Sequence, residues 1–177
     1  MALKTAAQYH ESLKTLHPTA YILGEKVENV HEHPLIKHMA ASVAKTYELQ
    51  HDPEGRKHLV TKSDLTGEEV SRFISFYKSP DDLLAKVRML KHLAQTIGGC
   101  FMRCTGMDAI NAVGIETHNC DQKYGTNYWQ RLLDFISYIQ TNDLVLFSGV
   151  TDVKGDRALR PSQQSDPDMY LRVVDRN

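Results

Sequence analysis

The sequence has few cysteines, prolines and glycines and no long apolar run, and each shortage excludes a class of protein. Its 177 residues include 3 Cys, 6 Pro and 10 Gly. So few cysteines, in a chain whose first residues have no apolar signal-peptide core, argue against a disulfide framework. So little proline and glycine excludes a collagen-like chain. No run of about 18 apolar residues occurs, so we predict no membrane-spanning helix and expect a cytoplasmic protein.

An excess of charge of one sign is also lacking. Lysine and arginine number 21 and aspartate and glutamate 22, which gives a formal net charge of -1. Such a chain has no strong global field to attract nucleic acid or an anionic membrane, so we expect neither as a partner. Hydrophobic residues make up 41% of the chain, so it can bury a core like that of an ordinary globular protein.

Helical patterns fill most of the first 142 residues. The clearest start is Ser79-Pro80-Asp81-Asp82, where serine can cap, proline fits the first turn and Asp82 completes a capping box. Gly98-Gly99 then interrupts the pattern, and a helix resumes or continues with a kink from Cys100. Apolar residues at steps of three and four predict the helices, over residues 5–17, 34–47, 68–77, 79–97, 100–113 and 127–140. Residues 52–55 are predicted to form a loop.

The pattern changes after Asp143. Residues 144–147 and 170–174 are short apolar runs typical of strands, and a long polar loop separates them. Two strands are too few for a stable sheet on their own. The sequence therefore predicts a mainly α fold, with a helical domain over residues 1–142 and the truncated start of a β domain over residues 143–177.

A pair of cysteines, Cys100 and Cys104, is the first candidate for chemistry. On a helix these positions share one face, and thiolates are soft ligands suited to zinc or iron–sulfur clusters. A pair supplies only half of a usual ligand set, although His92, His118 and Cys120 could add to it. The alternative is two buried cysteines that pack as small hydrophobic residues.

The polar loop after residue 150 is the second candidate. Gly155 permits close backbone approach, and Lys154, Arg157 and Arg160 gather positive charge. The loop could hold a phosphate-bearing or planar polar cofactor, or it could be a solvated hairpin loop. Residues 31–33, His-Glu-His, favour a solvated loop over a metal site because no third ligand is evident.

Three stretches carry a resemblance to a known family. They are GGCFMRCTGMDAINAV, DQKYGTNY and TDVKGDRALRPSQQSDPDMYLRVV. The chain resembles, over essentially its whole length, the N-terminal part of the 4-hydroxybutyryl-CoA dehydratase family. The wider group includes flavin-dependent aromatic hydroxylases of the 4-hydroxyphenylacetate type. The resemblance implies an acyl-CoA dehydrogenase-like fold, with an N-terminal helical domain, a central β domain and a C-terminal helical bundle.

The resemblance also implies cofactors and the residues that hold them. In these dehydratases, FAD and a [4Fe–4S] cluster share one active site, and the N-terminal domain supplies two cysteine ligands. A further histidine and cysteine come from later in the chain. Cys100 and Cys104 match the two N-terminal ligands. The flavin-contacting segment corresponds to Thr151, Lys154, Asp156, Arg157, Ser162 and Gln163. No catalytic residue can be named.

The implied activity belongs to a longer enzyme. Family members convert 4-hydroxybutyryl-CoA to crotonyl-CoA, isomerise vinylacetyl-CoA and form homotetramers. The downstream cluster ligands, most of the β domain and the C-terminal bundle have no counterpart in these 177 residues. We therefore expect the chain to be a fragment or a split subunit that is inactive alone.

Two alternatives remain. A reduced-flavin aromatic hydroxylase would lack the cluster and would bind its phenol through an arginine, a tyrosine and a histidine. Arg103 stands at the arginine position, but Met107 and Ser148 stand at the others, which argues against this branch. The other alternative is a non-catalytic helical module that binds a partner chain.

Overall fold

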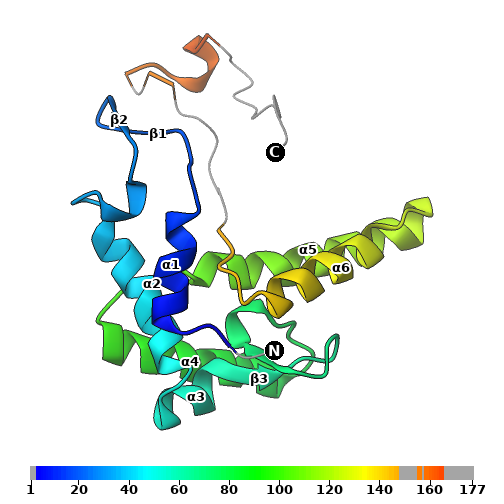
Figure 1. Ribbon diagram of the computed structural model, residues 1–177. Coiled ribbons are helices and arrows are strands. Elements are labelled where there is room, and N and C mark those ends of the chain that lie inside the picture. The colour runs from blue at the N-terminus through cyan, green and yellow to red at the C-terminus, as the bar shows by residue number, and fades with distance from the viewer. Residues whose placement is uncertain (1–2, 148–154, 157, 166–177) are drawn as a thin grey trace. The chain divides into compact units, whose positions relative to one another are not determined.

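The computed structural model describes residues 3–147, 155–156 and 158–165. The chain divides into two compact units, residues 1–147 and residues 148–177. In the described part, the first unit is mainly helical, as predicted, and carries two small antiparallel hairpins (Figure 1). Its helices are α1 (Ala6–Lys14), α2 (Lys37–Leu49), α3 (Pro53–Leu59), α4 (Pro80–Ile97), α5 (Cys104–Tyr124) and α6 (Tyr128–Thr141). Its strands are β1 (Ala20–Ile22), β2 (Glu25–Val27), β3 (Val60–Lys62) and β4 (Glu69–Ser71).

Helices α1 and α2 lie side by side (Figure 1), and they share an aromatic contact. Thr5 caps α1 in a reciprocal capping box with Gln8, so the helix begins close to its predicted start. The rings of Tyr9 and Tyr47 stack with centroids 4.9 Å apart. We call this packing centre the tyrosine cluster, formed by Tyr9, Val43, Ala44 and Tyr47.

Helix α4 confirms the capping box predicted at Ser79. The Ser79 side chain accepts from the backbone N–H of Asp82, and Pro80 occupies the first helical position. The buried side of the helix enters a second packing centre. We call it the central cluster, formed by Leu49, Leu59, Phe73, Met89, Leu93, Phe101 and Met107.

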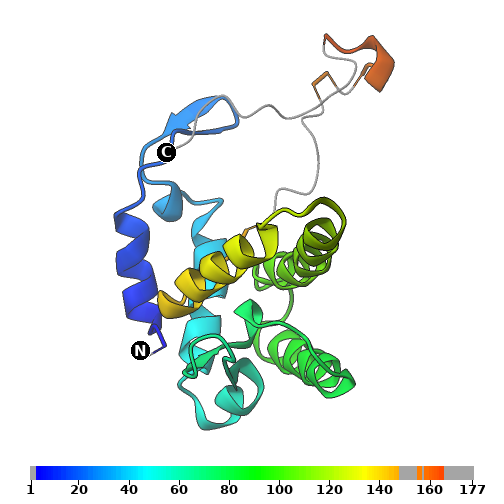
Figure 2. The same ribbon diagram turned by 90° about the vertical axis from the view of Figure 1, so that its right-hand side faces the viewer.

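Helices α5 and α6 form a hairpin (Figure 2). The carboxylate of Asp121 accepts from the backbone N–H groups of Tyr128 and Trp129, so α5 caps the start of α6. Between them lies a third packing centre, the isoleucine cluster, formed by Ile74, Ile110, Ile136 and Ile139.

Two predictions around residues 52–77 are wrong. Residues 52–55 begin helix α3, because Asp52 accepts from two backbone N–H groups and Pro53 opens the first turn. The helix predicted over residues 68–77 is strand β4 followed by a short 3-10 helix over Arg72–Ile74. The Arg72 guanidinium donates to the carbonyl oxygens of His58 and Val60 and so ties this segment to β3.

The strand predicted at residues 144–147 is not formed, and the segment is irregular. Its alternating apolar residues serve packing rather than pairing. Leu144 and Leu146 pack against the isoleucine cluster, whereas Val145 packs against the tyrosine cluster. The strand predicted at residues 170–174 lies outside the described residues, so the β domain predicted over residues 143–177 stays a prediction.

Candidate functional site

One cysteine of the pair lies within the connection between α4 and α5, and the other begins α5. Gly98 ends α4 in the left-handed conformation, with φ of 80°. Cys100 is therefore in the connecting loop and is exposed, while Cys104 is the first residue of α5 and is half-buried. Both are free thiols. The prediction that they share one helix face is wrong, because the helix does not resume until Cys104.

The three residues between the cysteines anchor the loop in the protein interior. Phe101 joins the central cluster, with its ring centroid 5.6 Å from that of Phe73. Met102 packs against the tyrosine cluster and has a left-handed backbone, with φ of 59°. A non-glycine residue keeps such a conformation only where its surroundings enforce it. Arg103, the third of these residues, is 2% exposed. The thiols thus flank a buried anchor.

The Arg103 side chain joins two of the packing centres. Its guanidinium lies 4.6 Å from the ring centroid of Tyr47 and 4.4 Å from that of Phe73. Its Nη1 donates to Thr46 Oγ1 at 3.0 Å, and its Nη2 lies 3.9 Å from Asp143 Oδ1. The Nη2 and Oδ1 atoms are buried, and no hydrogen bond in the described residues satisfies either of them. Two opposite charges therefore face each other away from water.

Asp143 is itself held from several sides. Its Oδ2 accepts from the backbone N–H of Lys4 at 2.9 Å and from Gln50 Nε2 at 3.0 Å. Its carbonyl oxygen accepts from the Tyr47 hydroxyl at 2.8 Å. Burial raises the pKa of Tyr47, and the Arg103 charge opposes that rise only in part. Tyr47 therefore stays a neutral donor, and Asp143 is fixed with φ of 42°.

The other ligands considered from sequence are engaged elsewhere. The ring of His92 stacks on His58 at 4.9 Å between centroids, and His118 meets the edge of Trp129 at 6.1 Å. Cys120 is a half-buried free thiol on α5. In the described part of the chain, no group of three or more His, Cys, Asp or Glu residues could hold a metal ion. The cysteine pair is therefore brought together with none of these candidates.

The flavin-contacting segment predicted from sequence is described only in part. Thr151, Lys154 and Arg157 lie outside the described residues. Asp156, Ser162 and Gln163 are exposed. Asp156 Oδ1 accepts from the backbone N–H of Ala158 at 2.9 Å, and Gln163 Oε1 accepts from that of Arg160 at 3.1 Å. Two of the three described side chains thus shape the segment itself.

Gln164, which the sequence indicates only as one of the loop's hydrogen-bonding side chains, organises this segment. Its Oε1 accepts from the backbone N–H of Asp156 at 3.0 Å. Its Nε2 donates to the carbonyl oxygens of Asp156 at 2.6 Å and Leu159 at 3.2 Å. It follows directly on Gln163 in the predicted segment, but no spacing rule marks a glutamine that bonds to backbone eight residues away.

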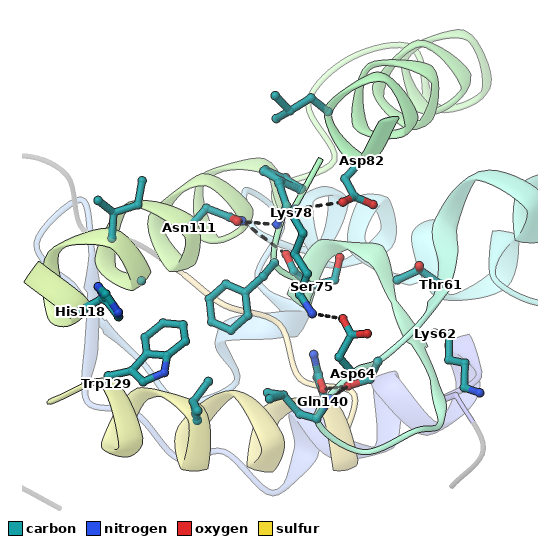
Figure 3. Close-up of a pocket in the computed structure, with 18 of the residues that line it drawn as sticks. Thr61, Lys62, Asp64, Ser75, Lys78, Asp82, Asn111, His118, Trp129 and Gln140 are labelled. Carbon is teal, nitrogen blue, oxygen red and sulfur yellow. Dashed lines mark hydrogen bonds and ion pairs between the residues drawn. The ribbon is translucent and has the colours of Figure 1, made fainter. Parts of the chain in front are cut away.

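A cavity of about 780 Å³ opens elsewhere in the first unit (Figure 3). Phe76 and Trp129 line it, with ring centroids 5.6 Å apart. Its polar groups largely bond to one another. The Ser63 hydroxyl donates to Gln140 Oε1 at 2.6 Å, and Asn111 Oδ1 accepts from the Tyr77 N–H at 2.8 Å. Neither cysteine of the pair lines this cavity. Its walls come from segments far apart in sequence, so no local pattern could have revealed it.

The hydroxylase-type use of Arg103 finds no support in this geometry. The guanidinium is enclosed by Tyr47, Phe73 and Asp143, and Met107 on the next turn of α5 is fully buried. Neither side chain offers a surface to a phenol.

Among the described residues, no helix combines the length and apolar character that crossing a membrane requires.

Comparison with known proteins gives relatives of two kinds. The chain is 48% identical over 174 residues to the 4-hydroxybutyryl-CoA dehydratase/vinylacetyl-CoA-Δ-isomerase of Clostridium aminobutyricum, covering 98% of this chain and 36% of that protein. It is 30% identical over 172 residues to the oxygenase component of 4-hydroxyphenylacetate 3-monooxygenase of Thermus thermophilus, covering 97% and 34%. The chain thus spans about a third of the length of these relatives.

Solved structures give the same two kinds of relative. An oxygen-tolerant archaeal 4-hydroxybutyryl-CoA dehydratase from N. maritimus superposes with a TM-score of 0.86 at 38% identity, over 99% of this chain and 35% of that one. An oxygenase component of 4-hydroxyphenylacetate 3-monooxygenase, complexed with FAD and 4-hydroxyphenylacetate, superposes with a TM-score of 0.67 at 27% identity, over 93% and 33%. Residues 5–177 match the family model described as 4-hydroxyphenylacetate 3-hydroxylase N terminal. The predicted kinship is confirmed, and the chain belongs to this family of dehydratases and monooxygenases as a partial, N-terminal region.

Proposed function

We propose that this chain is the N-terminal region of a flavin- and iron–sulfur-dependent 4-hydroxybutyryl-CoA dehydratase and vinylacetyl-CoA isomerase. In this proposal Cys100 and Cys104 are two ligands of the [4Fe–4S] cluster. The observation that carries it is the cysteine loop, in which two free thiols flank three anchored residues. The 48% identity to a dehydratase, against 30% to an oxygenase, supports the same branch.

The donor atoms of the loop fit an iron–sulfur cluster. Thiolate sulfur is the usual ligand of iron in such clusters. Cys100 is exposed and Cys104 half-buried, so both can be reached from outside the first unit. Cys104 also opens the 21-residue helix α5, and helix N-termini favour negative charge nearby. Two thiolates are half a ligand set, and we propose that the remaining ligands come from the rest of the longer enzyme.

The segment around Asp156 fits a supporting role in flavin binding. The exposed Ser162 and Gln163 side chains carry a hydroxyl and an amide that can meet the polar edge of a flavin. Gln164 holds the backbone of the same segment at Asp156. Thr151, Lys154 and Arg157 are proposed to complete this contact. When bound, FAD and the cluster would supply electron transfer and Lewis-acid polarisation of a leaving hydroxyl.

The acyl-CoA substrate and the homotetrameric assembly belong in this proposal to the intact enzyme. The chain's own residues hold cofactors, and none of those described is assigned as the catalytic base. The isolated chain should therefore show no dehydratase activity, which a direct assay for crotonyl-CoA formation checks.

Anaerobic reconstitution tests the ligand assignment. The purified chain is incubated with iron, sulfide and excess 2-mercaptoethanol, which can supply the missing thiolates. Unbound reagents are removed by desalting, and bound iron and visible absorption are then measured. The wild type and Cys120→Ser should both acquire an iron–sulfur chromophore. Cys100→Ser/Cys104→Ser should remain colourless. Equal iron uptake by all three proteins would refute the assignment.

A further inference from the structure

Arg103 occupies an unusual place in the cysteine loop. It directly precedes Cys104, yet its side chain runs inward and ends between Tyr47 of the tyrosine cluster and Phe73 of the central cluster. A buried arginine is rare unless its charge is compensated. Here the compensation comes from Asp143, which follows the C-cap of α6, and from the Thr46 hydroxyl.

The contact with Asp143 connects the loop to parts of the first unit distant in sequence. Asp143 is bonded to the backbone of Lys4 and to the side chains of Gln50 and Tyr47. These partners belong to two segments, the N-terminal Lys4 and the C-terminal end of α2, and three hydrogen bonds to them fix the position of Asp143. The guanidinium that faces it is fixed in turn, and with it the backbone that begins α5.

We propose that Arg103 is the positioning residue that holds Cys104, and thereby the Cys100–Cys104 pair, in the geometry that accepts the cluster. This inference rests on the function proposed above. Arg103 is the residue before the first turn of α5, so anchoring its side chain restrains the backbone that leads into Cys104. The left-handed backbone of Met102 transmits the same constraint back toward Cys100.

One pair of variants separates a structural role of Arg103 from a positioning role. Only the positioning role predicts that the thiols change in a variant whose stability is restored. Arg103→Met leaves the Asp143 carboxylate buried without its cation, so it should destabilise the fold. Arg103→Met/Asp143→Asn removes both charges. Asparagine keeps an acceptor for Lys4 and Gln50 and tolerates positive φ, so the double variant should regain stability. Arg88→Met, on the exposed side of α4, is the matched control.

Two readouts follow the thiols directly. The first is the alkylation rate of each cysteine by iodoacetamide in the folded, reduced chain, measured by mass spectrometry. The second is the affinity for iron during reconstitution with sulfide and 2-mercaptoethanol. Thermal unfolding, followed by circular dichroism, measures the stability of each variant in parallel with these two readouts. Cys120 serves as the internal reference, because it lies on the same helix well beyond the loop.

In the double variant we expect the wild-type unfolding midpoint, a Cys104 alkylation rate that rises toward that of Cys100, and iron affinity lower by about tenfold or more. Thr46→Val, which removes one hydrogen bond of the guanidinium, should shift both thiol readouts in the same direction by less. It also provides the test if the double variant does not fold.

Wild-type values of both readouts in a stably folded double variant would overturn the inference, as would wild-type values in Thr46→Val should the double variant not fold. If the wild type itself binds no cysteine-dependent iron, the proposed function fails. The alkylation rates still decide whether Arg103 positions Cys104.

Discussion

The two proposed cofactor-binding segments are held in place by different means. The cysteine loop is fixed by long-range contacts, since Phe101, Met102 and Arg103 are anchored in packing centres built from distant parts of the chain. In the described residues of the second unit, the segment around Asp156 is held by its own hydrogen bonds, chiefly from Gln163 and Gln164. The comparison teaches that the first segment takes its geometry from the fold, and the second from its local sequence.

Removing the Arg103 charge should have the largest effect, because it breaks the fold-imposed anchor. Arg103→Met leaves the 4% exposed Asp143 carboxylate without its ion-pair partner. We expect the free energy of unfolding to fall by about 3–5 kcal/mol. Urea denaturation measures the loss, and the control Arg88→Met should stay within about 0.5 kcal/mol of wild type. A loss no larger than that of the control would show that the anchor does not support the fold.

Adding a methyl group at Gly106 of α5, which Leu146 approaches closely, should have the next largest effect. A Cβ at Gly106 would lie 2.5 Å from the Cβ of Leu146 and 2.7 Å from its carbonyl oxygen. Because backbone must move to make room, Gly106→Ala should cost about 1–3 kcal/mol. Gly99→Ala, with open space at its Cβ, is the control. Equal unfolding midpoints for the two variants would contradict the close approach of residue 146 to α5.

Lowering the pH should destabilise the first unit by less than either substitution above, and it should leave the segment around Asp156 unaffected. Burial, and then the neighbouring His92, lower the pKa of His58 from its usual 6.5. The unfolded chain therefore binds the proton more readily, and the stability of the first unit should fall as the pH drops below 6.5. His58→Gln should flatten this dependence, whereas the exposed His38→Gln should not. The amides of Gln163 and Gln164 do not titrate, so amide exchange at Asp156, corrected for its intrinsic pH dependence, should be unaffected. An equally steep pH profile in His58→Gln would contradict the assignment.

The smallest change in stability is expected from Gln164. Gln164→Ala removes the acceptor for the Asp156 N–H and the donor to two carbonyl oxygens. Hydrogen exchange at Asp156 should quicken, while urea unfolding of the first unit should stay within about 0.5 kcal/mol of wild type. Ser162→Ala is the neighbouring control. Unchanged exchange at Asp156 would show that the segment is not held by its own side chains.

Local chemistry made part of the fold predictable. The capping box at Ser79 and the apolar spacing after it defined α4, because both signals lie within a few residues of each other. The strand β4 was missed because Val70, with Phe73 and Ile74 of the following 3-10 helix, fits a helical spacing. Its state is decided by pairing with β3 and by the Arg72 hydrogen bonds, and neither can be seen in a local window.

The residues of the candidate site were named from the sequence and stay a prediction, and the geometry around them could not be predicted. The resemblance to a known family identified Cys100 and Cys104. The assumption that both stand on one helix failed, because Gly98 ends α4 and the loop extends to Arg103. No sequence pattern predicts that the arginine between the two cysteines points inward to Asp143, which lies forty residues later. That contact depends on the packing of several helices.

Native mass spectrometry of the anaerobically reconstituted chain tests the central proposal most directly, because it counts the iron and sulfide held by each polypeptide. We predict a species heavier by a [4Fe–4S] cluster, on one chain or shared between two, in the wild type and in Cys120→Ser. The species should be absent from Cys100→Ser/Cys104→Ser. A cluster of the same mass on the double cysteine variant would contradict the assignment of Cys100 and Cys104 as its ligands.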